Sequence, residues 1–109
     1  MSGTSILDRI RQLAEKGDVL VSTHGLQRFL KRRILFDEIV AGVADGEVIE
    51  PYPDAYYGPS VLVLQAAGIT QLVHVVWGIE KGTDRPAVII SAYRPNLLQW
   101  TPDFRTRLP

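Results

Sequence analysis

Apolar residues in the N-terminal half of the chain recur every three or four positions. This spacing keeps apolar side chains on one face of a helix. It predicts helices over residues 5–16, 23–32 and 36–45. Ser5 followed by Asp8 is typical of a capped helix start. Gly17 and Gly46 come directly after the first and third predicted helices, where a glycine commonly ends a helix.

After Gly46 the apolar pattern changes to a period of two, which is typical of strands. It predicts strands over residues 48–52, 61–66, 71–79 and 87–93. Val19–Val21 is interpreted as a short extended link or a brief strand. Helices followed by a run of strands favour an α+β fold. We therefore expect N-terminal helices packed on one face of a four-stranded, mainly antiparallel sheet.

Length and composition indicate one domain over residues 1–109, with an irregular tail at 97–109. Lys+Arg and Asp+Glu number 12 each, and this balance argues against strong non-specific binding of nucleic acid. The chain has no cysteine, which excludes disulfides and thiolate metal sites and favours a cytoplasmic location. No apolar run approaches the roughly 18 residues that span a bilayer. We expect no metal, no cofactor and no membrane contact.

The most informative stretch is 24–33, which holds four cations and no acid. At helical spacing His24, Arg28 and Arg32 share one face. An imidazole can move a proton near neutral pH, and a guanidinium can hold a phosphate with two hydrogen bonds. This face would suit RNA or another phosphate ester. The alternative interpretation is a solvated basic helix face without chemistry.

Two further candidates lie in the predicted strands. His74 alternates with the apolar Leu72 and Val76, which favours a half-buried structural histidine over a shielded acid or base. Tyr93 and Arg94 end the last strand, where a hydroxyl and a guanidinium could hold a phosphate. Their alternative interpretation is an aromatic that covers the sheet edge beside a surface arginine.

Several short motifs, taken in order, resemble the bacterial "domain of unknown function 4258" family. The resemblance covers about residues 17–96 and departs from the family pattern at Gly25, Arg33 and Leu35. The motifs that carry it are His24-Gly25-Leu26-Gln27-Arg28, Arg32-Arg33-Ile34, Gly46-Glu47-Val48-Ile49-Glu50-Pro51-Tyr52-Pro53, Pro59-Ser60-Val61-Leu62-Val63-Leu64, Leu72-Val73-His74-Val75-Val76 and Ser91-Ala92-Tyr93-Arg94-Pro95.

The family is similar in layout to the RelE-like toxins, which are compact α+β ribonucleases. The resemblance implies a bacterial toxin that cleaves RNA without a metal and is blocked by a cognate antitoxin. Such cleavage needs an acid, a base and cations on the phosphate. His24, His74 and Tyr93 are the candidates for catalysis, and Arg28, Arg32 and Arg94 for substrate binding.

A second hypothesis remains open beside the ribonuclease. The protein would be a non-catalytic interaction module, and its basic helix would bind an acidic partner protein or nucleic acid. Its two histidines would then be structural. The sequence does not decide whether the protein is an enzyme.

Overall fold

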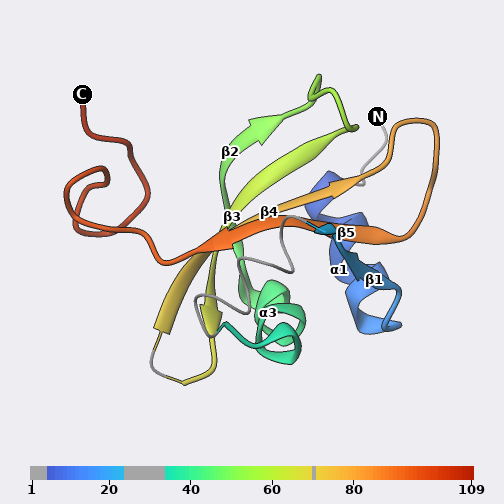
Figure 1. Ribbon diagram of the computed structural model, residues 1–109, viewed down its shortest axis with the longest axis horizontal. Helices are drawn as coiled ribbons and strands as arrows, with labels where there is room; N and C mark the ends of the chain where they lie inside the picture. The colour runs from blue at the N-terminus through green and yellow to red at the C-terminus, as the bar shows by residue number, and fades with distance from the viewer. Residues whose placement is uncertain (1–4, 24–33, 70) are drawn as a thin grey trace.

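The computed structural model describes residues 5–23, 34–69 and 71–109, and its centre is a five-stranded sheet (Figure 1). The strand order is β1-β5-β4-β3-β2. The strands are β1 (Val19–Val21), β2 (Glu47–Tyr52), β3 (Ser60–Ala67), β4 (Gln71–Ile79) and β5 (Ala87–Tyr93). The last four form an antiparallel meander, whereas β1 pairs with β5 in parallel.

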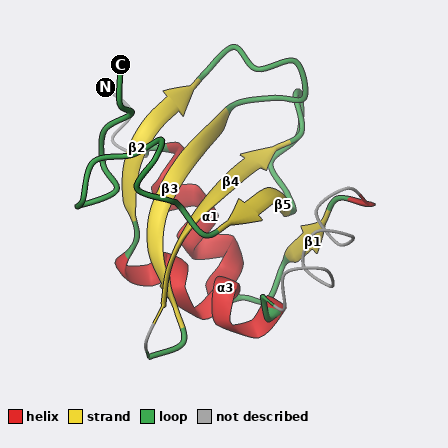
Figure 2. Cartoon of the chain, turned by 60° about the vertical axis from the view of Figure 1, so that its left-hand side comes forward, coloured by secondary structure: helices red, strands yellow, loops and turns green. Residues whose placement is uncertain are grey.

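Two short helices are present in the part of the chain that the structure describes. α1 (Ile6–Glu15) begins at Ser5, whose hydroxyl accepts a hydrogen bond from the Asp8 backbone N–H at 3.1 Å. α3 (Phe36–Gly42) continues into a single 3-10 turn, Val43–Asp45. Both helices lie on the same face of the sheet (Figure 2). Neither has the length and apolar character needed to cross a bilayer.

The predicted fold class is wrong. The sheet has five strands and is mixed, not four-stranded and mainly antiparallel, and the described residues hold only two short helices. The error comes from Val19–Val21, because three residues are too few to show a strand period. Their partner, Ala87–Ile89, lies far along the chain, so the parallel pair has no local sequence signal. The predicted helix over 23–32 falls almost entirely outside the described residues.

The main core lies between the two helices and the sheet. Ile10 and Ile39 from the helices pack there against strand residues such as Val75 and Ile89. The helical and alternating patterns of the sequence predict seven buried residues: Leu26, Phe29, Ile39, Val43, Leu62, Val75 and Ile89. The last five are buried, and Leu26 and Phe29 lie outside the described residues.

The second face of the sheet is covered by a different part of the chain. Leu62 and Leu64 are buried but do not belong to the core under the helices. In Figure 2 the C-terminal tail, residues 96–109, crosses the face that is turned away from α1 and α3. The apolar residue that anchors it is Trp100, which is 2% exposed. The tail thus gives this small sheet a second buried layer.

Candidate functional site under the C-terminal tail

The centre of the covered face is His74 in β4, whose side chain is fully buried. Its Nε2 lies 2.8 Å from the backbone oxygen of Phe104, and its Nδ1 lies 3.0 Å from the Tyr93 hydroxyl. A carbonyl can only accept, so Nε2 must carry the proton and donate it. Nδ1 then accepts from the Tyr93 hydroxyl. The neutral imidazole therefore uses both of its nitrogens inside the protein.

A β-bulge in β5 places Tyr93 beside His74. Ala87 and Ile89 belong to the core under the helices, so simple alternation would turn Tyr93 towards the helices as well. The register between β4 and β5 shifts between Val76 and Trp77, and His74 pairs with Tyr93. One extra residue in a strand reverses the face of every residue beyond it. The bulge therefore turns Tyr93 to the covered face.

A second bulge, in β2, brings two carboxylates to the same face. Glu47 pairs with Leu64 and Glu50 pairs with Leu62, and the register shifts between them. In a regular strand two residues three positions apart would point to opposite faces. Because of the bulge, Glu47 and Glu50 both lie on the covered face.

Two arginines of the tail bind these carboxylates with both arms of the guanidinium. Arg105 contacts Glu47 with Nε and Nη2 at 2.9 and 3.0 Å. Arg107 contacts Glu50 in the same way at 2.7 and 3.1 Å. This fork geometry is specific to arginine and sets the position of the tail along β2.

Aromatic rings connect the arginine to the histidine. The Arg107 guanidinium lies 4.7 Å from the centre of the Trp100 ring. The Trp100 ring in turn meets His74 edge-on, with 4.3 Å between centroids. His74 also meets the Tyr93 ring edge-on, with 5.2 Å between the ring centroids. The site is therefore a continuous series of contacts that runs from two tail residues, Arg107 and Trp100, to two sheet residues, His74 and Tyr93.

Burial sets the protonation of the site. It lowers the pKa of His74 below its ordinary 6.5, and the Arg107 cation also lowers this pKa. The hydrogen bond to the Phe104 carbonyl and the charge of Glu50 act in the opposite direction. Burial also raises the pKa of Tyr93, so its hydroxyl keeps the proton that it donates to His74. A neutral histidine, a protonated tyrosine and two ion pairs are thus the stable state near neutral pH.

Acid should weaken the docking of the tail in two stages. The buried His74 resists protonation more than an exposed one does, so docking should weaken as the pH falls below 6.5 towards the lowered pKa. A second loss should begin below 4.5, because the bonds to Arg105 and Arg107 lower the pKa values of Glu47 and Glu50 in the docked state.

Acrylamide quenching of tryptophan fluorescence, followed during an acid titration, would measure this release. Trp100 should become accessible, and Trp100→Phe should remove the change in signal. His74→Gln offers a neutral donor to the Phe104 carbonyl and should abolish the first stage while leaving the second. A first stage that persists in His74→Gln would contradict the assignment to His74.

The predicted site residues have three different outcomes. The structure brings His74 and Tyr93 together, which alternation alone would not predict. Arg94 lies at the exposed end of β5, and its Nε donates to Gln71 at 2.9 Å. His24, Arg28 and Arg32 lie outside the described residues, so their predicted placement near Tyr93 stays a prediction. The catalytic and substrate-binding roles of all six residues also stay predictions.

Sequence reasoning missed the residues that bind the tail. In the sequence, Glu47 and Glu50 stand out only as part of a motif, and Arg105 and Arg107 belong to the tail that is expected to be irregular. The available signal was the pair of arginines at alternate positions after a tryptophan. No local pattern reveals that this segment returns to β2.

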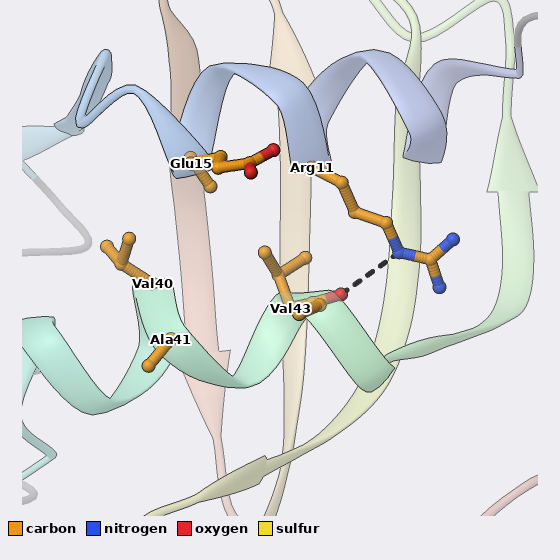
Figure 3. A pocket seen from close by; sticks show the side chains of 7 residues that line it. Arg11, Glu15, Val40, Ala41 and Val43 are labelled. Carbon is orange, nitrogen blue, oxygen red and sulfur yellow. Dashed lines mark hydrogen bonds between the residues drawn. The ribbon is translucent and has the colours of Figure 1, made fainter.

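Apart from the covered face, a concave surface lies between α1 and α3 (Figure 3). It has a volume of about 420 Å³ and is lined mainly by small apolar side chains. The Arg11 side chain spans one end, where its Nε donates to the Val43 carbonyl at 3.2 Å (Figure 3). Its Nη2 donates to the Gly46 carbonyl at 2.6 Å. Because those bonds hold Arg11 in place, it ties α1 to the turn before β2.

Across residues 5–23, 34–69 and 71–109, acidic and histidine side chains do not gather in a group of three that could hold a metal ion.

The fold and the covered histidine define a small mixed α/β domain whose second sheet face is closed by its own tail. Residues 21–94 match the family described as "Domain of unknown function (DUF4258)". This match covers more than half of the chain, and the protein belongs to that family. No curated protein and no solved structure matches the chain. The family match includes His74, Tyr93, Glu47 and Glu50 but ends before the tail.

Proposed function

We propose that this protein is a non-catalytic interaction module that binds an acidic partner protein through the cations of residues 24–33. The observation that carries the proposal is the state of His74. Its side chain is fully buried, and both ring nitrogens are already hydrogen-bonded within the protein. A general base must come within about 2.6–3.2 Å of the proton that it removes. A substrate cannot reach His74 while the tail is docked.

The charge distribution supports a protein partner over RNA. The chain has no net charge, and strong non-specific binding of nucleic acid depends on an excess of cations. Residues 24–33 nevertheless hold Arg28, Lys31, Arg32 and Arg33 without an acid. A run of cations in an otherwise neutral protein favours a partner with an acidic surface of limited extent.

The competing proposal is a bacterial RelE-like toxin that cleaves RNA and is blocked by a cognate antitoxin. It rests on the family resemblance and would have to use His24, or His74 after movement of the tail. Cleavage would then depend on proton transfer by one of these histidines. General acid–base catalysis of this kind usually raises the reaction rate about 10²- to 10⁴-fold.

One assay separates the two proposals. Fluorescently labelled polyglutamate and labelled single-stranded RNA of similar charge would be titrated with the protein in EDTA. We expect polyglutamate to bind, and Arg28→Glu/Arg32→Glu to weaken binding about tenfold, since reversing two charges should remove roughly 1.4 kcal/mol of binding free energy. Lys16→Glu/Lys81→Glu makes the same change in net charge outside the segment and should have little effect.

The RNA in this assay should remain intact. RNA cleavage by the wild type that falls in His24→Ala would overturn the interaction module in favour of the toxin. Equal weakening of polyglutamate binding by both charge-reversal variants would also contradict the proposal, because it would show that only net charge matters.

A further inference from the structure

We infer that the sheet face around His74 is a docking groove for a looped segment of another protein, and that the tail is an exchangeable cover of that groove. The segment would carry an aromatic residue and two arginines in the spacing of Trp100, Arg105 and Arg107. This surface differs from the cationic segment of the proposed function and does not depend on it.

The first support is the boundary of the family domain. The floor of the groove is formed by Glu47, Glu50, His74 and Tyr93, all inside residues 21–94. The cover begins after that boundary. The floor therefore lies inside the family match, whereas the cover lies outside it.

The second support is that the tail lies on the sheet as a ligand would. Its backbone hydrogen bonds close it on itself, as from Thr101 N to the Thr106 carbonyl at 2.9 Å and from Leu108 N to the Gln99 carbonyl at 2.9 Å. It is bound to the sheet through the two arginine forks, the Trp100 ring and the Phe104 carbonyl. A foreign segment could offer the same groups.

The third support is strain in the docked tail. Phe104 has φ 61°, in the left-handed region that residues other than glycine rarely occupy. The carbonyl of this same residue accepts the hydrogen bond from His74. Strained residues of this kind concentrate at ligand clamps and switch regions. Release of the tail would relieve the strain, which makes exchange easier.

The fourth support is charge. Without the tail, the face would present two carboxylates, Glu47 and Glu50, beside His74. Their placement on one face requires the bulge in β2. Arginine forks match carboxylates better than lysine does, because two parallel hydrogen bonds form. The groove therefore selects an arginine-containing segment.

A peptide competition experiment tests the inference. The probe is a fluorescein-labelled peptide with the sequence of residues 96–109, titrated against the full chain. In the wild type the attached tail fills the groove, and only molecules with a released tail can bind the peptide. The apparent affinity for the peptide is therefore reduced in proportion to the fraction of such molecules. Arg105→Ala/Arg107→Ala loosens the attached tail and should raise the affinity for the peptide about tenfold or more.

Three controls make the result specific. Adding Glu47→Gln/Glu50→Gln to the loosened variant should abolish the gain, and so should replacing both arginines of the peptide by alanine. Arg105→Lys/Arg107→Lys keeps the charge without the fork and should give an intermediate affinity. Equal affinity of wild type and loosened variant, or a gain that survives loss of the two carboxylates, would overturn the proposal. A wild type that is dimeric in light scattering, and that Arg105→Ala/Arg107→Ala makes monomeric, would also overturn it, because a second copy would then be the occupant.

Discussion

Replacing Trp77 with alanine should lower the free energy of unfolding by about 3–5 kcal/mol, the usual range for deleting a fully buried large aromatic side chain. Trp77 lies in β4 on the face under the helices and is completely buried. Its removal leaves a cavity between sheet and helices that the surrounding backbone can fill only in part. Urea unfolding of the wild type and the variant would measure the loss.

The indole also begins a pair of hydrogen bonds that together link β4, β3 and α3. Trp77 Nε1 donates to Gln65 Oε1 at 2.9 Å, and Gln65 Nε2 donates to the Ile39 carbonyl at 2.7 Å. The side chain of Gln65 is therefore fixed between β4 and α3. Trp77→Phe keeps most of the volume but leaves the Gln65 oxygen unpaired, which costs about 1–3 kcal/mol.

The comparison of these variants separates packing from hydrogen bonding. Leu98→Ala is the control, since Leu98 is 89% exposed and its truncation should change stability by less than about 0.5 kcal/mol. If Trp77→Phe were as stable as the wild type, the bond to Gln65 would contribute nothing. If Trp77→Ala lost no more than Leu98→Ala, the assignment of Trp77 to the core would fail.

Elements with a strong local pattern could be predicted from the sequence. The helix expected over 5–16 is α1, Ile6–Glu15, because its apolar residues recur at helical spacing behind a capping serine. The strands expected after Gly46 are present within a residue at each end. In both cases neighbouring residues supply the whole signal.

Features that depend on distant residues could not be predicted. The parallel pairing of Val19–Val21 with Ala87–Ile89 turns the expected four-stranded sheet into a mixed five-stranded one. The two bulges are also invisible in the alternation, yet they decide that Tyr93 and both carboxylates face His74. The tail looks irregular in sequence because its partners lie on β2 and β4. The candidate site is thus made by the parts of the fold that local patterns do not encode.

Replacing Gly42 with alanine should destabilise the protein, although alanine is the better helix former. Gly42 ends α3, where the gain in helix propensity would be about 1 kcal/mol. However, a Cβ at this position would overlap the backbone carbonyl oxygen of Ala66 in β3 and would lie 2.9 Å from Gln65 Nε2. The glutamine side chain can move, but the strand backbone cannot do so without disturbing the sheet.

The steric cost should therefore decide the sign of the effect. Overpacking costs about 1–3 kcal/mol, and contact with a fixed backbone favours the upper end of that range, so we expect a net loss of about 2 kcal/mol. The neighbouring Ala41 is exposed, and Ala41→Gly should lose only about 1 kcal/mol through helix propensity. Chemical denaturation of both variants would compare these losses. A Gly42→Ala protein more stable than the wild type would show that α3 does not approach β3 as closely as the structure indicates.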